Sequence, residues 1–419
     1  MNNKKMKTLV IILSFLTLPL INSLSTPSSV YSKTDSSEGY QQIIINADGD
    51  QELVIYTHDS FLAWGSDPET TLNTAFYDWG IANDVTITLK LFSGMVNALN
   101  SLILEKDAPE ADVIIGLDNI MIHRAKEAEV LQPYSDANLE NISSSLVAAL
   151  DPEKYLLPID YGLIALIFDT EYITTSTYPE LNSLTFDTLL STFGDDFVVQ
   201  DPTLSATGLG FLLYQIIFYE EVLDLDWKTW WEAAKGTVSI DQSWSDSWSR
   251  VFDAKEDHIM SSYGSDPAYN AYNNYSFEKN GVLISKDSTE YGWMQIEGIG
   301  LVNGATNVTL AKSYIDYALS PTVQSLLALN NWMSPSNTEV ELPPSYNYAI
   351  TTDNVTILNT LVTADYVSTN YQLWLNEWEQ IIFDTGYWWL WVLIPAVVIL
   401  VGFITTIVIF TKRKRLDIE

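Results

Sequence analysis

Apolar and polar positions follow two different periods in the first third of the chain. Residues 53–57 form a continuous apolar run that predicts a buried strand, and residues 85–92 alternate apolar and polar positions as a half-buried strand does. Residues 68–79 and 95–104 instead repeat their apolar positions at helical spacing. Strands that alternate with helices predict βαβ units and a mostly parallel sheet in an α/β protein.

Polar side chains follow two of these predicted strands. His58 and Asp59 come directly after the first strand, and Asp118 and Asn119 follow another strand at residues 111–116. In open α/β sheets, ligands bind outside the carboxyl ends of the strands. We therefore expect these side chains to lie at a ligand site.

The middle of the chain predicts a second lobe. Residues 158–162 lead into a long apolar strand at 163–169 that is suited to crossing between lobes, and a strand at 197–200 leads through a turn at 201–208 into a helix. Small hydroxyl residues and free amides at a helix start can hold an anion or a polar tail, but an ordinary helix cap has the same composition. Apolar runs at 282–284 and 298–302 predict strands that return to the first lobe.

Two tyrosines flank a turn sequence in the segment at residues 261–269. Tyr263 and Tyr269 stand on either side of Gly-Ser-Asp-Pro, a composition that favours a bent loop over a helix or strand. The two rings and Asp266 suit a flat, positively charged organic molecule, through stacking and cation–π contacts. The alternative is a surface turn with two half-buried tyrosines.

Both ends of the chain carry apolar segments. Residues 9–21 follow three lysines and predict a secretion signal, and the Ser/Thr-rich residues up to 40 predict a linker. Residues 387–410 contain no charge and would span about 36 Å as a helix, enough to cross a membrane. Basic residues at 412–415 follow, so the positive-inside rule predicts a single-pass protein with its binding domain outside and its C-terminus in the cytoplasm.

Composition excludes several kinds of site. The chain has a net charge of −34, which disfavours nucleic acid and anionic ligands, although solubility or a salty habitat also explains such a charge. It contains no cysteine, so disulfides and thiolate metal sites are excluded. Its three histidines share no ligand spacing, and we expect no metal site.

Several motifs occur in an order that resembles a known family. The motifs are Tyr56-Thr57-His58-Asp59-Ser60-Phe61, Gly116-Leu117-Asp118-Asn119, Asp160-Tyr161-Gly162, Gln200-Asp201-Pro202 through Gly208-Leu209-Gly210, Trp244-Ser245, Ser262-Tyr263 to Pro267-Ala268-Tyr269, and Asn331-Trp332-Met333. Between residues 53 and 381 the chain thus resembles the thiamine-binding proteins of ABC importers. The resemblance implies a two-lobed, periplasmic-binding-protein-like (type 2) fold with a hinge, here followed by a C-terminal transmembrane helix.

The resemblance also implies a set of ligand-binding residues. It consists of an aromatic clamp, two carboxylates that offset ligand charge, polar wall residues, and a turn that faces the hydroxyethyl or phosphate end of the ligand. The predicted residues are His58, Asp59, Asp118, Asn119, Tyr161, Ser205, Thr207, Gly208, Trp244, Tyr263, Ser265, Asp266, Tyr269, Asn331 and Trp332. Two departures from the family pattern are His58, which replaces an aromatic residue, and the turn Ser205-Ala206-Thr207-Gly208, which puts phosphate recognition in question.

The function implied is a membrane-tethered extracellular receptor. It would bind thiamine, thiamine monophosphate or thiamine diphosphate as a monomer and deliver it to an ABC transporter permease, with no cofactor and no catalytic role. The alternative ligands are a polyamine or ferric ion. An enzyme that uses Asp59 and Asp118 as acid and base lacks a nucleophile–His pair or a metal set, and the strand-end motifs argue against a surface adhesion protein.

The predicted divisions follow from this reading of the chain. They are a signal segment and linker at 1–40, lobe 1 (first part) at 41–160, lobe 2 at 161–280, the return to lobe 1 with C-terminal helices at 281–384, a transmembrane helix at 385–411 and a cytoplasmic tail at 412–419.

Overall fold

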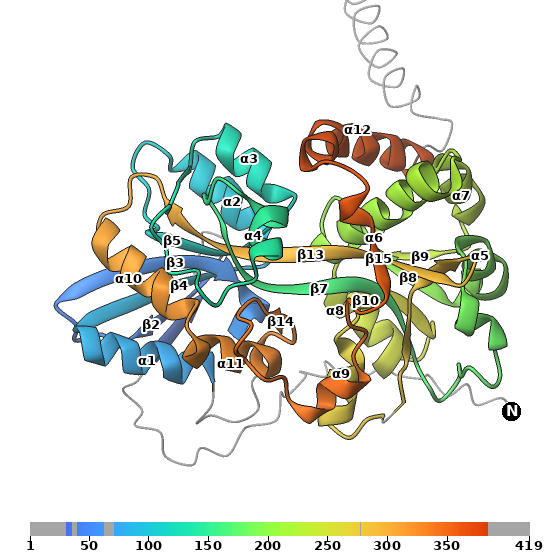
Figure 1. Cartoon of the computed structure of the whole chain (residues 1–419), viewed down its shortest axis with the longest axis horizontal. Coiled ribbons are helices and arrows are strands. Elements are labelled where there is room, and N and C mark those ends of the chain that lie inside the picture. The colour runs from blue at the N-terminus through green and yellow to red at the C-terminus, as the bar shows by residue number, and fades with distance from the viewer. Residues whose placement is uncertain (1–30, 36–39, 63–70, 277, 384–419) are drawn as a thin grey trace, which may run out of the picture.

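A computed structural model of the chain describes residues 31–35, 40–62, 71–276 and 278–383. Two lobes lie side by side and share one mixed sheet, whose strand order is β1-β2-β4-β3-β5-β13-β7-β10-β8-β9 (Figure 1). The two-lobed α/β part of the predicted fold class is therefore confirmed.

The first lobe is built on a mostly parallel set of strands. Strand β3 pairs in parallel with β4 and β5, and β2 joins β4 in antiparallel orientation. The strands are β1 (Tyr31–Asp35), β2 (Tyr40–Ile45), β3 (Gln51–His58), β4 (Val85–Phe92), β5 (Val113–Asp118) and β6 (Leu131–Gln132). The helices are α1 (Leu72–Asn83), α2 (Met95–Leu104), α3 (Met121–Glu127), α4 (Ser144–Leu150), α10 (Val308–Ala318) and α11 (Pro321–Asn330).

Helices cover both faces of this sheet, which explains its apolar sequence. All six residues of β5 are buried, because a strand covered on both sides has no face toward water. One apolar cluster joins the sheet to α1 and α10, and another joins its opposite face to α2 and α3. Because β3 and β5 are parallel, their carboxyl ends lie at the same edge of the sheet, which faces the second lobe. Polar residues follow both strands at this edge.

The second lobe has a core rich in aromatic rings. Phe186, Phe211, Trp230, Trp231 and Trp378 pack edge-on against one another. The strands are β8 (Phe197–Gln200), β9 (Ser239–Asp241) and β10 (Ile259–Tyr263). The helices are α5 (Phe186–Phe193), α6 (Ala206–Ile217), α7 (Lys228–Ala234), α8 (Trp244–Trp248), α9 (Asp266–Tyr272) and α12 (Ala364–Phe383).

Two long antiparallel strands run through both lobes. They are β7 (Leu157–Phe168) and β13 (Thr289–Val302), and β13 also pairs with β5. Short strands complete the sheets: β11 (Gly281–Val282), β12 (Ile284–Lys286), β14 (Ser334–Pro335) and β15 (Val355–Ile357). Short helical turns are η1 (Asp59–Leu62), η3 (Pro179–Ser183), η4 (Gly194–Asp196), η5 (Phe218–Leu223), η6 (Ser249–Asp253), η7 (Pro344–Tyr348) and η8 (Leu358–Thr360).

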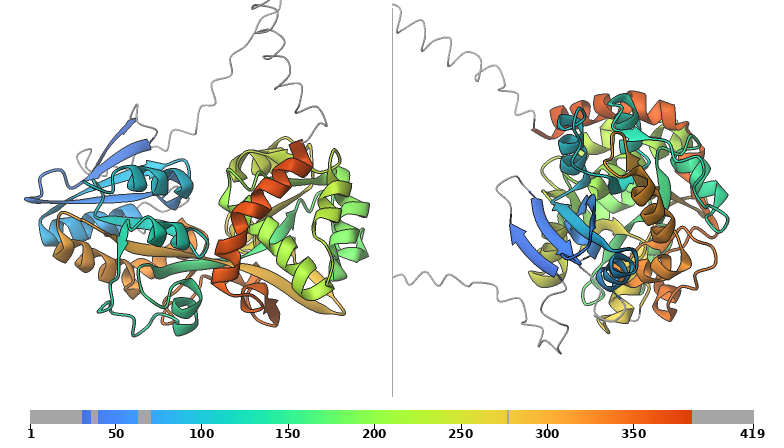
Figure 2. Two further views of the ribbon diagram at one scale, coloured as in Figure 1. Left: turned by 90° about the horizontal axis from the view of Figure 1, so that it is seen from above. Right: turned by 90° about the vertical axis from the view of Figure 1, so that its left-hand side faces the viewer.

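Three local expectations differ from the structure. The predicted linker contains β1, which pairs with β2. The tyrosine segment is not one bent loop but the end of β10 followed by α9, because Ser265 and Pro267 fit the start of a helix. The last helix, α12, packs on α7 of the second lobe instead of returning to the first, as Figure 2 shows.

The predicted membrane-spanning helix is corrected here. In the part of the chain that the structure describes, no helix combines the length and the apolar character needed to cross a bilayer. The segments at 1–30, 385–411 and 412–419 lie outside the described residues. The two-lobed fold is retained, whereas the predicted transmembrane topology, the membrane partner and the cytoplasmic C-terminus are not.

Candidate functional site

A cleft of about 520 Å³ lies between the two lobes. The first lobe contributes the end of β3 and the start of α2, and the second lobe contributes the turns before α6, α8 and α9. Gly116 of β5, Met121 of α3, strand β13 and the segment after α11 also line the cleft. The cleft therefore lies at the carboxyl ends of β3, β8, β9 and β10, as expected for an α/β sheet.

Four of the aromatic side chains that line the cleft contact one another in a row. Trp244 stacks on Trp248 with 5.0 Å between ring centroids, and Trp248 meets the edge of Tyr269 at 5.6 Å. Tyr269 in turn meets Trp332 at 5.1 Å and 89°. Trp332 follows the end of α11 and adopts a positive φ of 56°, which turns the chain back toward the cleft. Together these rings form a continuous apolar wall, which we call the aromatic wall.

A buried carboxyl group helps to orient Trp244. The indole Nε1 of Trp244 donates to Ser262 Oγ at 2.6 Å, and Ser262 Oγ donates to Asp266. Asp266 is 5% exposed, and this burial raises the pKa of its carboxyl to about 7. The hydrogen-bond chain fixes the plane of the indole, because its N–H has only one direction in which to donate.

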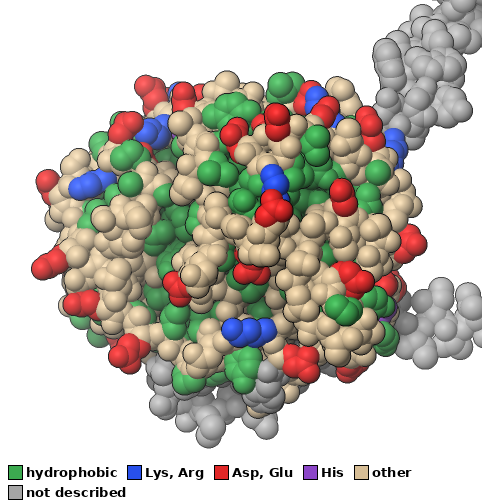
Figure 3. All heavy atoms as spheres, turned by 45° about the vertical axis from the view of Figure 1, so that its right-hand side comes forward, with side chains coloured by type: hydrophobic (Ala, Val, Ile, Leu, Met, Phe, Trp, Pro, Cys, Tyr) green, Lys and Arg blue, Asp and Glu red, His purple; other side chains and the backbone are tan. Residues whose placement is uncertain are grey.

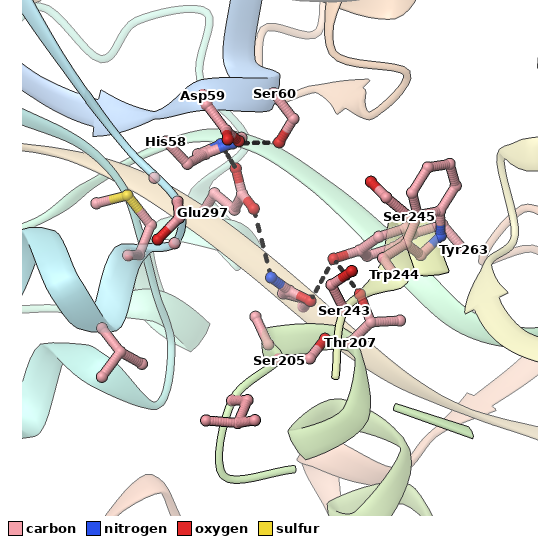
Figure 4. Close-up of a pocket in the computed structure, with 18 of the residues that line it drawn as sticks. His58, Asp59, Ser60, Ser205, Thr207, Ser243, Trp244, Ser245, Tyr263 and Glu297 are labelled. Atoms are coloured by element: carbon pink, nitrogen blue, oxygen red, sulfur yellow. Dashed lines mark hydrogen bonds and ion pairs between the residues drawn. The ribbon is translucent and has the colours of Figure 1, made fainter. Parts of the chain in front are cut away.

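A second hydrogen-bond chain extends across the cleft (Figure 4). Thr207 Oγ1 donates to the Tyr263 hydroxyl at 3.2 Å, and this hydroxyl donates to Gln295 Oε1 at 3.2 Å. Gln295 Nε2 then donates to Glu297 Oε1 at 3.3 Å. Burial, and then the charge of Glu297, raises the pKa of the Tyr263 phenol, so that it remains a donor.

The same chain continues into the first lobe. Glu297 Oε2 lies 3.7 Å from His58 Nε2, and His58 Nδ1 lies 2.7 Å from Ser60 Oγ. Glu297 is only 7% exposed although it lines the cleft. Residues of both lobes thus meet at a carboxylate on the crossing strand β13.

Ten of the predicted site residues line the cleft. They are His58, Asp59, Ser205, Thr207, Trp244, Tyr263, Asp266, Tyr269, Asn331 and Trp332. Asp118, Asn119, Tyr161, Gly208 and Ser265 do not belong to the lining.

The residues outside the lining have other contacts. Asp118 Oδ1 accepts from the backbone amides that begin α3. The backbone amide of Ile296 in β13 donates to Asn119 Oδ1 at 3.0 Å. Gly208 packs against the backbone of β8, where a Cβ atom would overlap the carbonyl of Gln200. Tyr161 packs in the core of the first lobe, and Ser265 lies buried at the start of α9.

Gln295 and Glu297 are among the cleft residues that the sequence analysis missed. They are two polar residues, two positions apart, in the otherwise apolar stretch 291–302 of β13. Side chains two apart in a strand share one face, so this pattern indicated a polar feature on that face. The prediction overlooked it because it began the returning strand at residue 298.

The charge of the cleft is one-sided. Asp59, Asp246, Asp266 and Glu297 line it, and none of its described lining residues is Lys or Arg. Acidic side chains also outnumber basic ones on the face drawn in Figure 3. In the described part of the chain, no group of three or more His, Asp or Glu side chains is placed to hold a metal ion. The arrangement suits a cationic organic ligand with flat rings.

Known proteins resemble this chain in sequence. No protein-family model matches it. The thiamine-binding periplasmic protein of Escherichia coli (strain K12) is 26% identical over 331 residues, which cover 78% of this chain and 92% of the relative. The thiamine-binding periplasmic protein of Haemophilus influenzae is 25% identical over 336 residues, which cover 80% and 93%. These names describe binding and not a reaction, which agrees with the expectation that the chain is not an enzyme.

Solved structures share the fold. A periplasmic thiamin binding protein matches with a TM-score of 0.65 and 24% identity, over 79% of this chain and 96% of that one. The ferric binding protein from Campylobacter jejuni matches with a TM-score of 0.59 and 17% identity, over 78% and 99%. The chain is therefore a relative of the thiamine-binding periplasmic proteins that shares the two-lobed fold of periplasmic binding proteins.

Proposed function

We propose that the cleft binds thiamine or one of its phosphate esters, and that the protein delivers this ligand to the permease of an ABC importer. The observation that carries the proposal is the combination of the aromatic wall with a cleft that has four acidic lining residues and no described Lys or Arg. The sequence relatives, which are named for thiamine binding, support the choice of ligand.

Thiamine matches the cleft in shape and charge. Its aminopyrimidine and thiazolium rings are flat, and the thiazolium carries a permanent positive charge. Each well-placed contact between a cation and a ring contributes about 0.5–2 kcal/mol, more when water is excluded. The wall is held in place before a ligand arrives, because Trp244 is hydrogen-bonded and Trp332 is buried between Tyr269 and Tyr346. A preorganised wall lowers the entropic cost of binding.

The start of α6 is the place where a phosphate ester would lie. Ser205 caps this helix, and Thr207, two residues further on, also lines the cleft. Helix amides and hydroxyls can bind a phosphate, but the described lining supplies no guanidinium or ammonium group to neutralise it. We therefore propose that free thiamine binds at least as tightly as its mono- and diphosphate.

Calorimetric titration of the purified full chain tests the proposal. Thiamine, thiamine monophosphate, thiamine diphosphate, spermidine and ferric citrate are titrated separately. Sub-micromolar binding of thiamine supports the proposed ligand. Binding of spermidine or ferric citrate without thiamine binding would keep the receptor fold and replace the ligand. A diphosphate that binds tenfold more tightly than thiamine would contradict the ranking argued for the α6 turn.

A further inference from the structure

Glu297 lies in the middle of three buried carboxyl groups. Strand β13 pairs with β5 on one side and β7 on the other, and Glu297 stands opposite Asp118 and Asp160 in these two pairings. Glu297 is 7% exposed, Asp118 is 1% exposed and Asp160 is fully buried. Such a row is unfavourable because like charges lie close together away from water.

The two flanking carboxyl groups are held by hydrogen bonds within the fold. Asp118 Oδ1 accepts from the amides of Ile120 and Met121, both at 2.9 Å. Asp160 Oδ2 accepts from Asn331 Nδ2 at 2.8 Å. Neither Asp118 nor Asp160 belongs to the cleft lining. Each therefore has a structural partner that accounts for its place in the sheet.

Glu297 differs from its neighbours because it lines the cleft, whereas an unpartnered oxygen is shared with Asp160, whose Oδ1 atom has no hydrogen-bond partner among the described residues either. In Glu297 the oxygen without a hydrogen-bond partner among the described residues is Oε2. His58 Nε2, at 3.7 Å, also has no hydrogen-bond partner within the described chain. The other carboxylate oxygen of Glu297, Oε1, accepts a hydrogen bond from Gln295, and Gln295 in turn accepts one from the Tyr263 hydroxyl. One oxygen is thus engaged and oriented, and the other is left for a group in the cleft.

Repulsion among the three carboxyl groups is relieved at Asp118 and Asp160, the two flanking members of the row. Burial, and in addition the charge of Glu297, raises the pKa of Asp118 to about 6. Burial and the charge of Glu297 raise the pKa of Asp160 as well. The two groups behind the cleft therefore take up protons more readily than an ordinary aspartate, which relieves repulsion within the row.

We propose that Glu297 is the residue that recognises the positive charge of the ligand, and that it determines the preference for a cation over a neutral molecule of the same shape. This assignment rests on the proposed function. The cation lies against Oε2, while the aromatic wall supplies the stacking area. Asp59, which also lines the cleft, is exposed, so water screens its charge.

Paired binding measurements on Glu297→Gln test this assignment. Three probes are used: thiamine, 3-deazathiamine with a neutral thiophene in place of the thiazolium, and oxythiamine, which keeps the thiazolium but lacks the amino group. We expect the variant to lose about tenfold to hundredfold in affinity for thiamine and oxythiamine, since the thiazolium has no N–H to donate and is attracted to Glu297 by its charge alone. For 3-deazathiamine we expect a loss of at most about threefold, because glutamine keeps the shape and one acceptor oxygen.

Two further variants serve as controls. Glu297→Asp keeps the charge and should keep the preference for thiamine over 3-deazathiamine, even where both affinities fall. Asp59→Asn removes the same charge from an exposed position, and we expect a loss of less than about fivefold. Chemical denaturation of each variant reports on folding independently of ligand.

The outcomes separate the two proposals. Equal losses for thiamine and 3-deazathiamine in Glu297→Gln would overturn the assignment and leave the proposed function standing. A loss confined to ligands with the amino group would also overturn it, because Glu297 would then accept a hydrogen bond and not recognise charge. A wild-type chain that binds no thiamine would overturn the proposed function and this assignment together.

Discussion

Asp266→Asn is expected to make the protein more stable above neutral pH. Asp266 is buried beneath the aromatic wall, and burial raises its pKa from the ordinary 3.8 to about 7. The difference corresponds to about 4 kcal/mol at 1.36 kcal/mol per pKa unit, as an upper limit. Asparagine has nearly the same shape and retains an oxygen that can accept from Ser262, so the substitution removes the charge with little change in packing.

The sign follows from proton linkage. Because the pKa of Asp266 is raised in the folded state, the folded protein binds more protons than the unfolded chain between about pH 4 and pH 7. The contribution of Asp266 to the free energy of unfolding is therefore present at about pH 4 and is lost as the pH rises toward 7. Asp118 and Asp160 also have raised pKa values, so they too make the free energy of unfolding fall as the pH rises. The informative quantity is therefore the difference in the free energy of unfolding between the variant and the wild type at each pH.

Urea denaturation at several pH values from 4 to 8, followed by tryptophan fluorescence and circular dichroism, measures this difference. We expect the two proteins to be similar near pH 4 and Asp266→Asn to gain up to about 4 kcal/mol in the free energy of unfolding by pH 8. Asp59→Asn is the control, because an exposed carboxylate loses little hydration on folding. A variant that follows the wild-type pH dependence throughout would refute the argument that burial sets the charge state of Asp266.

Three other substitutions test the wall and the core. Tyr269→Ala should weaken thiamine binding at least about tenfold with little loss of stability, since Tyr269 is half-buried and contacts both Trp248 and Trp332 in the aromatic wall. An unchanged affinity in calorimetry would show that Tyr269 does not contact the ligand. Gly208→Ala should lower the free energy of unfolding by about 1–3 kcal/mol, because the added methyl meets the backbone of β8. Gly94→Ala is its matched control, since a Cβ atom there meets nothing within 4 Å, and equal effects would contradict the packing argument. Trp378→Ala should cost about 3–5 kcal/mol in the same denaturation assay, because this fully buried ring fixes α12 on the second lobe; a cost below about 1 kcal/mol would show that α12 is peripheral.

Local sequence patterns predicted much of the first lobe. The apolar run at 53–57 and the alternation at 85–92 correspond to β3 and β4, and the helical spacing at 95–104 corresponds to α2. These elements were predictable because burial on a strand or helix imposes a short period on the sequence. The boundary of α1 moved to Leu72, where Thr71 caps the helix by accepting from the Thr74 amide.

The candidate site shows where local patterns stop being informative. Trp244, Tyr269 and Trp332 were predicted from a family resemblance, and the structure brings all three to the cleft. Asp118 has the same strand-end position as Asp59, yet it does not line the cleft and instead accepts from the amides at the start of α3. The sequence contains both aspartates but not the direction in which each side chain points.

The sequence by itself determined most strands and helices of the first lobe, the scarcity of basic groups and the supply of aromatic rings. Only the tertiary structure decided that Glu297 meets His58, although 239 positions separate them in the chain. That contact arises because β13 inserts between β5 and β7, a pairing between segments remote in sequence. A period of two residues states which face of a strand is polar, but the partner strands that bury this face are chosen by the packing of the whole sheet.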